Sequence, residues 1–505
     1  MHPSRRAVLL GGAALPLLRI PAFAASPPGT LTFGLSTFPP ALQPWAQTGT
    51  AAVTVKALIY RGLLSFAADG KIRGELAQSW ERDGTAWVFK LREAVFHNGA
   101  PVTADDVKWT LEQVAAEKST AYFKAEFQAA QAIETPDPRT IRIVMKQPTA
   151  TLPLLLANPH MPILARGSTD GQALGIGAGP YVLKAQERGV SLDFTASDKY
   201  YKPGLPKTKA IRMVVYADEN LRVTALQAGD VDMIEYVPWQ HMQAIEADPR
   251  LKLDAANGPF MALSFNGTTG PFKDARLRRA VAYAIRREEI VQAAFFGRGA
   301  PLLGLPIEPG NPFYEDRFAK VWSYQPEKAK ALMAEAGVAK GFSCTLLSTA
   351  QYGMHKSTAE IVQQHLAEIG IQANLNLPDW ATRVNMGNKG QYEFCVQGTT
   401  ADNNDPDGLA SLIDGELPAS VARSFGLSTP RIHELFIAGR AEFDPAKRKV
   451  LYNELFERAL DEAPMVGLAW RSQGYGMAKN VMGFKSYSGA LNFFSGLGLE
   501  ETFLA

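Results

Sequence analysis

The chain has only two cysteines and seven histidines among its 505 residues. The histidines are scattered along the sequence and show no metal-binding spacing. No Gly-x-Ser-x-Gly or His-Glu-x-x-His motif is present, because His433-Glu434 lacks the second histidine of the zinc motif. We therefore expect a protein that is not an enzyme and that holds no metal and no cofactor. An exported hydrolase is the remote alternative.

The chain also has little excess charge of either sign, since its formal net charge is +2 at pH 7. Proteins that bind nucleic acid through its phosphates need an excess of lysine and arginine, so we expect no nucleic-acid partner. One basic cluster is present, at Arg276, Arg278, Arg279, Arg286 and Arg287. In a chain that is close to neutral, this pattern is typical of the solvated face of a helix.

Long hydrophobic runs are missing as well. The apolar run at about residues 7–18 is shorter than the roughly 20 residues that span a bilayer. It follows the pair Arg5-Arg6 and precedes a small-x-small sequence that ends at Ala24. This pattern resembles a twin-arginine export signal, and Arg19 near the cleavage site fits that route. We expect cleavage near Ala24 and a periplasmic mature protein; the alternative is the basic amphipathic start of a cytosolic protein.

Length and cysteine usage bear on the organisation of the mature chain. A chain of 505 residues is too long for one hydrophobic core, so two or three domains are expected. Cys344 and Cys395 lie in predicted strands of one sheet. Export permits a disulfide, but a bridge between parallel strands is geometrically awkward, which favours two buried thiols.

Residues 71–111 have strong local signals. The run of aromatic and β-branched residues at 87–91 predicts a strand, and turn dipeptides flank it at 83–84 and 98–99. A helix is predicted to begin at Thr103, because Asp106 stands where the reciprocal partner of a capping box belongs.

Residues 342–400 alternate between strand and helix patterns. Strands are predicted at 342–347, 371–377 and 392–396, with a helix at 358–369 and a short helix near Trp380. This order implies parallel strands with right-handed crossovers. In such sheets ligands bind beyond the carboxyl ends of the strands, so the three loops that leave this edge form the candidate site.

Those loops carry side chains suited to binding a small solute. The first contains Tyr352, His355 and Lys356, the second contains Trp380, and the third spans residues 398–407. In the N-terminal part, Trp45 lies in a proline-rich loop. It is a candidate ligand contact if exposed, and the alternative is an aromatic side chain that packs on its own lobe.

The order of motifs in the first half of the chain resembles a known family. The motifs are Leu76-Ala-x-Ser79-Trp80, Asp83-Gly84, Trp87-x-Phe89-x-Leu91-Arg92, His97-Asn98-Gly99 and Pro101-Val-Thr-Ala-Asp-Asp-Val107. Together they resemble the signature of the family 5 extracellular solute-binding proteins, the periplasmic receptors of peptide, nickel and related ABC importers. The resemblance implies an α/β fold: a two-lobed periplasmic binding protein of type II, similar to cluster C, with an extra small subdomain.

The resemblance also implies a division of the chain. Residues 1–24 would be the twin-arginine-type signal peptide. Residues 25–50, 166–261 and 475–505 would form lobe I, with 51–165 as its peripheral subdomain, and residues 262–474 would form lobe II.

In the family, an aspartate three residues before an Asp-Pro pair binds the amino group of a bound peptide. Asp402 stands at that position, and the alternative is that it only organises a turn. Trp380 matches a tryptophan that walls the pocket, although a core residue at a helix start is an equal alternative. Thr399 and Thr400 replace a Gly-Trp pair, which leaves a stacking contact without its residue. Asp405, directly before a proline, is expected to be structural.

The carboxylate of the ligand has no predicted partner. Dipeptide binders of the family place an arginine in the first loop, where this chain has His355 and Lys356. The function implied is a monomeric receptor that captures a small peptide or an amine-bearing solute and delivers it to an inner-membrane ABC permease. The alternatives within the family are a nickel chelate, haem, an opine or an oligosaccharide.

Overall fold

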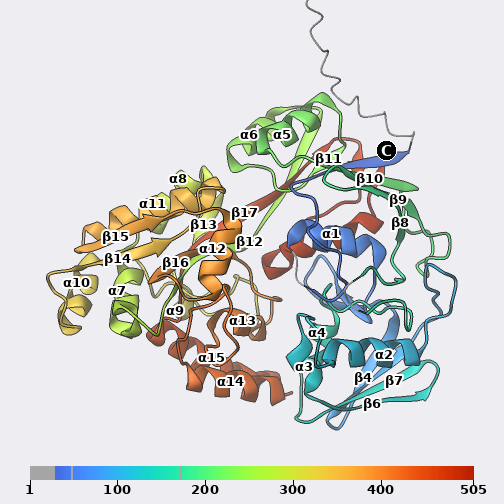
Figure 1. The fold of residues 1–505 in the computed structure, drawn as a ribbon, viewed down its shortest axis with the longest axis horizontal. Helices are drawn as coiled ribbons and strands as arrows, with labels where there is room; N and C mark the ends of the chain where they lie inside the picture. Colours follow the sequence, from blue (N-terminus) through green and yellow to red (C-terminus); the bar gives the residue numbers. More distant parts are fainter. Residues whose placement is uncertain (1–28, 47–48, 171–172) are drawn as a thin grey trace, which may run out of the picture.

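Two lobes lie side by side and share one sheet in the computed structural model, which describes residues 29–46, 49–170 and 173–505 (Figure 1). The predicted signal peptide lies outside the described residues. In this part of the chain the shared sheet has eleven strands, in the order β15-β14-β16-β12-β17-β11-β1-β10-β9-β8, with β13 paired to β17. The two-lobed α/β fold expected from the sequence is confirmed.

Lobe I contains the right-hand part of the sheet in Figure 1. Strands β1 and β10 are parallel, and β1 also pairs in parallel with β11. Its elements are β1 (Thr30–Leu35), α1 (Thr50–Ile59), β2 (Leu64–Phe66), β3 (Ile72–Gly74), β8 (Tyr181–Glu187), β9 (Ser191–Ala196), β10 (Ala210–Val215), α5 (Glu219–Ala228), β11 (Met233–Ile234), α6 (Trp239–Ala247), β18 (Val481–Met482), η3 (Gly489–Glu500) and β19 (Phe503–Leu504).

A separate four-stranded antiparallel sheet forms the peripheral part of lobe I, in the order β4-β5-β7-β6. The predicted strand at 87–91 lies in β5, and α2 begins as predicted, because the Thr103 backbone N–H donates to the Asp106 carboxylate at 2.9 Å. The elements are β4 (Ala77–Asp83), β5 (Ala86–Leu91), α2 (Ala104–Ala115), α3 (Lys124–Gln128), β6 (Ala130–Asp137), β7 (Thr140–Met145) and α4 (Leu152–Leu156).

Lobe II contains the predicted parallel strands, since β14 pairs in parallel with both β15 and β16. The carboxyl ends of the three strands therefore meet at one edge. The elements are η1 (Pro271–Lys273), α7 (Ala275–Ala284), α8 (Arg287–Phe295), β13 (Gly299–Pro301), α9 (Asp316–Ala319), α10 (Pro326–Glu335), β14 (Phe342–Leu347), α11 (Gly353–Ala367), β15 (Ile371–Asn376), α12 (Trp380–Asn388), β16 (Phe394–Thr399), η2 (Pro406–Leu409), α13 (Ala410–Ile413), α14 (Pro430–Ala441) and α15 (Pro445–Glu462).

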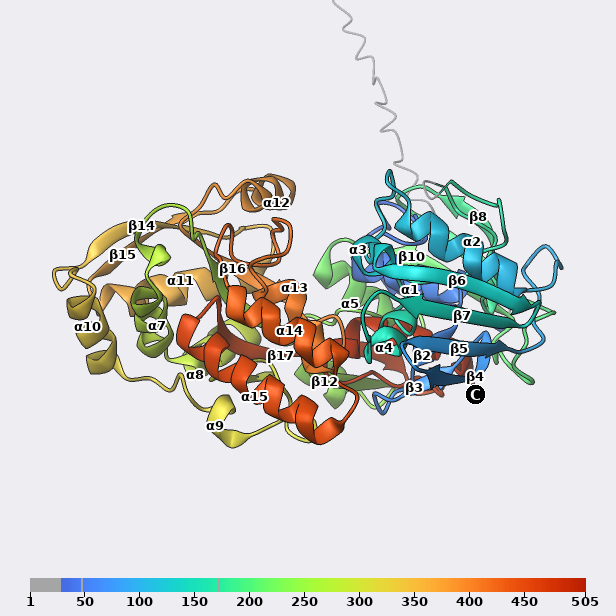
Figure 2. The ribbon, with the colours of Figure 1, turned by 90° about the horizontal axis from the view of Figure 1, so that it is seen from below.

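Two long antiparallel strands, β12 (Leu251–Phe265) and β17 (Met465–Ala478), run from one lobe into the other (Figure 2). The pairing between them shifts register twice, between Asn257 and Phe260 and again between Met261 and Ala262. Irregular pairing of this kind bends a strand locally. The predicted lobe boundaries near 262 and 475 fall within these strands, and the division itself stays a prediction.

The prediction for the two cysteines is confirmed, whereas the prediction for the basic cluster is wrong in part. Cys344 and Cys395 are free, buried thiols on neighbouring parallel strands, as predicted. The predicted solvated face of the basic cluster is wrong for Arg278 and Arg287, which are 3% and 0% exposed. Both guanidinium groups donate to backbone carbonyls, and these bonds offset the loss of hydration.

Candidate functional site

Three of the predicted side chains meet at the carboxyl-terminal edge of the lobe II strands. Tyr352 is the N-cap residue of α11, His355 lies in the first turn of that helix, and Trp380 begins α12. The centroid of the Trp380 ring lies 5.3 Å from that of Tyr352 and 5.6 Å from that of His355. The two loops are also linked directly, because the Trp380 backbone N–H donates to the side chain of Gln351 at 3.0 Å.

His355 is the buried member of this aromatic cluster, with 2% of its surface exposed. Burial holds its pKa well below the usual value, and the nearby charges of Arg383 and Arg471 lower it further. The ring is therefore neutral at physiological pH. Its Nδ1 has no hydrogen-bond partner among the described residues.

The third loop begins with the two predicted threonines. Thr399 is the last residue of β16 and pairs with Phe260 on β12, so it lies where lobe II meets the crossing strands. Thr400 follows it, and its buried hydroxyl has no hydrogen-bond partner in the described part of the chain.

Asp402 lies between the lobes. Its carboxylate accepts a hydrogen bond of 2.7 Å from the hydroxyl of Tyr122, and its backbone carbonyl accepts one of 3.3 Å from Asn158. Burial raises the pKa of Asp402 to about 6, and the acids Glu126 and Asp407 add to the rise. Within the described residues Asp402 forms no ion pair, and the guanidinium of Arg423 interacts with it only at longer range.

Asp405, three residues on, has the structural role that its position before a proline predicts. Its carboxylate accepts the backbone N–H of Asp407 at 2.9 Å and thereby caps η2. The guanidinium of Arg448 binds both carboxylate oxygens, at 2.6 and 2.7 Å. The turn after Asp402 is thus fixed to helix α15.

Trp45 lies away from the other predicted residues. It is buried, its indole N–H donates to the carbonyl of Pro162 at 3.1 Å, and its ring lies 6.3 Å from that of Trp109. All these partners belong to lobe I and its peripheral part. The alternative interpretation, an aromatic side chain packed on its own lobe, therefore describes Trp45.

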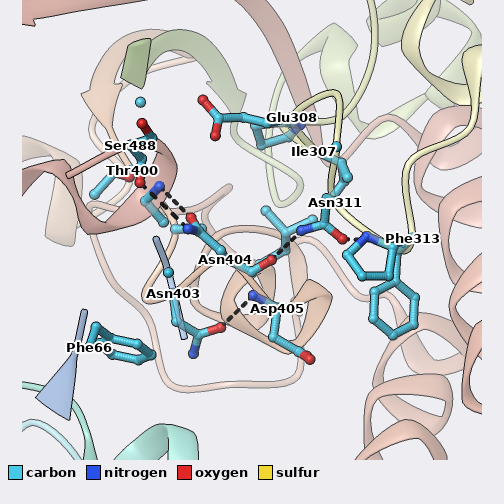
Figure 3. A pocket seen from close by; sticks show the side chains of 18 of the residues that line it. Phe66, Ile307, Glu308, Asn311, Phe313, Thr400, Asn403, Asn404, Asp405 and Ser488 are labelled. Atoms are coloured by element: carbon cyan, nitrogen blue, oxygen red, sulfur yellow. Dashed lines mark hydrogen bonds between the residues drawn. The ribbon is translucent and has the colours of Figure 1, made fainter. Parts of the chain in front are cut away.

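A cavity of about 660 Å³ is lined by residues of both lobes and of the crossing strands, and Thr400 is the only one of the seven predicted residues among them. Figure 3 shows Asn404 at its centre, hydrogen-bonded to Asn311 on one side and to the segment at Ser488 on the other. The lining residues are Phe66, Ala68, Asp69, Gly70, Lys71, Leu154, Gly258, Phe260, Pro306, Ile307, Glu308, Pro309, Gly310, Asn311, Pro312, Phe313, Thr400, Ala401, Asn403, Asn404, Asp405, Leu409, Trp470, Ser488 and Ala490.

Sequence reasoning missed two buried polar residues of the crossing strand β17, one of which contacts the helix that carries His355. Arg471 donates to the sulfur of Met354, which is next to His355, and Gln473 is buried two residues further on. A signal for them was present in the sequence. A charged and an amide side chain interrupt the otherwise mostly apolar run Met465–Ala478, and buried polar groups need a partner.

The described residues contain neither a metal-binding cluster nor a membrane-spanning helix. In the ranges that the structure describes, no group of three or more His, Cys, Asp or Glu side chains is placed to hold a metal ion. No helix in the same ranges combines the length and the apolar character needed to cross a bilayer.

Comparison with known proteins places the chain among binding proteins. The family profile of the bacterial extracellular solute-binding proteins, family 5 Middle, matches residues 71–419. The glutathione-binding protein GsiB of Escherichia coli (strain K12) is 28% identical over 462 residues, which cover 88% of this chain and 89% of that protein.

Solved structures agree with this assignment. The binding protein AgaA from A. tumefacien R10, in complex with agropinic acid, is 39% identical and superimposes with a TM-score of 0.87 over 94% of this chain and 99% of that chain. The periplasmic binding protein DppA from Helicobacter pylori, in complex with the peptide STSA, is 21% identical over 94% of this chain and 98% of that one. Its TM-score of 0.83 shows the shared fold. With its fold, its lobes and its family profile in agreement, this chain belongs to the family 5 bacterial extracellular solute-binding proteins.

Proposed function

We propose that this protein is a monomeric periplasmic receptor that captures a small solute with an amino group and a carboxylate, peptide-like in chemistry, and delivers it to an inner-membrane ABC permease. It performs no catalysis in this proposal. The observation that carries the ligand class is Asp402, a buried carboxylate between the lobes with acidic neighbours and no ion-pair partner among the described residues. An ammonium group of the solute would supply the missing positive charge through charge-assisted hydrogen bonds.

The remaining predicted residues have roles that fit this ligand. Tyr352, His355 and Trp380 would form an aromatic wall on the lobe II side. The hydroxyl of Thr400, which has no partner among the described residues, would donate to the solute. Thr399 would fix the position of Thr400 through its pairing with β12. Trp45 would act from within lobe I, by supporting the Tyr122 loop through the hydrogen bond from the Tyr122 backbone N–H to the Trp45 carbonyl at 2.9 Å.

A second ligand class has its own support. The protein is 39% identical to AgaA, whose structure contains agropinic acid, and only 28% identical to GsiB, which binds glutathione. An opine-like organic acid is therefore the alternative ligand. All three ligands named for these relatives, agropinic acid, glutathione and the peptide STSA, carry a carboxylate, so the acid group is their common feature.

Titration calorimetry with purified protein tests the proposal. The ligands are agropinic acid, glutathione and the peptide Ser-Thr-Ser-Ala, with glucose as the uncharged control. A ligand that binds at micromolar concentration or below should also reduce the radius of gyration in small-angle scattering, because two lobes joined by crossing strands close over a bound solute. Binding of glucose alone, or hydrolysis of the peptide, would contradict the proposal.

A further inference from the structure

Arg471 on β17 is a buried arginine without an adequate acceptor. Its side chain is 1% exposed, and its one hydrogen bond runs from Nη1 to the sulfur of Met354 at 2.8 Å. The guanidinium also lies 5.8 Å from the ring centre of Tyr236 and 5.9 Å from that of Phe493. A thioether is a weak acceptor. No carboxylate of the described chain forms an ion pair with Arg471, and its Nε has no partner there.

Other buried arginines of this protein have oxygen acceptors, so burial alone does not explain why Arg471 has none. Arg222 donates to three backbone carbonyls and Arg287 to four. Arg383 donates to the carbonyl of Val396 and to the side chain of Gln397. An unpaired charge away from water is strongly unfavourable. The described residues give Arg222, Arg287 and Arg383 two or more oxygen acceptors each, whereas Arg471 has only the sulfur of Met354.

Gln473, on the same strand, is a second buried polar residue without a hydrogen-bond partner among the described residues. Its side chain is 2% exposed, and neither its amide nitrogen nor its amide oxygen has a partner among the described residues. Side chains two residues apart on a strand lie on the same face, so Arg471 and Gln473 share the face opposite to Trp470. Trp470 lines the 660 Å³ cavity, whereas Arg471 faces the aromatic cluster through Met354.

The position of Arg471 joins both lobes to the crossing strands. Met354 belongs to α11 of lobe II, while Tyr236 lies two residues after the end of β11 in lobe I. Tyr236 has a left-handed backbone with φ of 55°, which a residue with a side chain adopts at a cost and which often accompanies a functional site. On the β12 side, Arg471 lies opposite the register shift between Asn257 and Phe260.

We propose that Arg471 and Gln473 bind the carboxylate of the captured solute, at the point where the crossing strands pass between the lobes. The guanidinium offers parallel N–H donors that match a carboxylate, and the Gln473 amide adds a further donor. This inference rests on the proposed function and adds the carboxylate partner that the first loop lacks. A carboxylate held here contacts groups from both lobes, so its binding favours the closed arrangement.

Stability without ligand gives the first test. A ligand-anchoring arginine that is uncompensated in the free protein destabilises it, whereas a structural arginine stabilises it. The variants are Arg471→Met and, as the matched control, Arg287→Met, which removes an equally buried guanidinium. After ligand removal by partial unfolding and dialysis, Arg471→Met should melt at the same temperature as the wild type or higher, and Arg287→Met should melt lower. A fall for Arg471→Met as large as that of Arg287→Met would overturn the proposal.

Affinity gives the second test, with agropinic acid, glutathione and Ser-Thr-Ser-Ala as probes, each compared with its methyl ester. For any probe that binds the wild type, Arg471→Met should weaken binding at least about thirtyfold, because the acid loses a desolvated ionic partner. The ester should bind both proteins with similar, weak affinity, since the acid and the arginine form one interaction in a double-mutant cycle. Equal weakening of acid and ester would overturn the carboxylate role.

The two tests distinguish an error in the proposed ligand class from an error in the proposed role of Arg471. If no probe binds the wild type, the proposed ligand class is wrong, and the melting comparison still decides whether Arg471 is a structural residue. If a probe binds but the Arg471→Met variant keeps wild-type affinity for the acid, the ligand class stands and the anchor is overturned. Gln473→Met provides an intermediate case, with a smaller loss of affinity than Arg471→Met and no loss of melting temperature.

Discussion

The hydroxyl of Tyr122 donates to the carboxylate of Asp402 across 2.7 Å, and this bond joins the peripheral part of lobe I to the loop after β16 in lobe II. The bond satisfies one lone pair of the carboxylate but leaves its charge uncompensated. Tyr122 is itself buried, and burial together with the neighbouring Asp402 raises its pKa well above the usual value, so the phenol stays a donor. The contact therefore connects the lobes without neutralising Asp402.

Asp402→Asn should weaken binding of an amine-bearing solute at least about thirtyfold and leave the fold intact. The reason is that loss of one partner of a desolvated charged pair costs on the order of 2–5 kcal/mol. Titration calorimetry measures the effect, and Tyr122→Phe is the control, because it removes the hydrogen bond to Asp402 but keeps the carboxylate. Wild-type affinity in the Asp402→Asn variant would favour a solute without a free amine, such as a sugar or a metal chelate.

The raised pKa of Asp402 predicts proton release on binding. At about pH 6 the free protein has this carboxyl about half protonated, and an ammonium ligand binds only the ionised form. Affinity should therefore increase from pH 5 to pH 7, and calorimetry at pH 6 in two buffers of different ionisation enthalpy should show release of about half a proton. The Asp402→Asn variant should show no such buffer dependence.

The raised pKa of Asp402 also makes the stability of the folded protein depend on pH. Because the pKa is higher in the folded protein than in the unfolded chain, the folded state binds more protons between about pH 4 and pH 6, and this contribution to stability is lost as the pH rises through that window. A difference of about two pKa units corresponds to on the order of 3 kcal/mol. The change in the free energy of unfolding between pH 4 and pH 6.5, measured in urea without ligand, should differ by about this amount between the wild type and Asp402→Asn, because the other shifted acids contribute to both proteins.

Asp405→Asn should lower stability with little effect on affinity. It disrupts the two-oxygen contact with Arg448, in which both side chains are about one-eighth exposed, and leaves the arginine without its partner. The expected loss is about 3 kcal/mol in the free energy of unfolding. Asp83→Asn is the control, because its ion pair with Arg142 is mostly exposed and such pairs contribute little. An unchanged melting temperature for Asp405→Asn would contradict the structural role.

Replacement of Arg5 and Arg6 by lysine tests the export route. The paired arginines are what the resemblance to a twin-arginine signal depends on. We expect the double variant to remain as a precursor in the cytoplasm, as judged by immunoblotting of cell fractions. Normal processing to the mature form would indicate the general secretory route.

Much of lobe II was predictable because its signals are local. The strand at 342–347, the start of α12 at Trp380 and the parallel order around β14 follow from hydrophobic periodicity and chain order. Helix α11 begins at Gly353, earlier than the predicted 358, because its first turn contains polar residues that packing makes helical. The periodicity of the sequence alone cannot show this.

The candidate site was predictable only in part, for a physical reason. Tyr352, His355 and Trp380 come from neighbouring loops of one sheet, so topology brings them together. Arg471 lies 117 residues after its contact Met354, and its lack of an oxygen acceptor appears only when the surrounding acceptors are placed. For the same reason, the basic cluster could not be divided into exposed and buried arginines from its spacing.

The ion pair between Arg61 and Glu500 has a consequence for how the chain acquires its structure. The two side chains lie 2.7 Å apart and are almost fully buried, although 439 residues separate them in sequence. The segment η3 that carries Glu500 also packs against α1. Lobe I therefore cannot complete its core while the chain is still being synthesised, and contacts of such high sequence separation form slowly. The chain should stay open to chaperones and proteases until its last residues have left the ribosome.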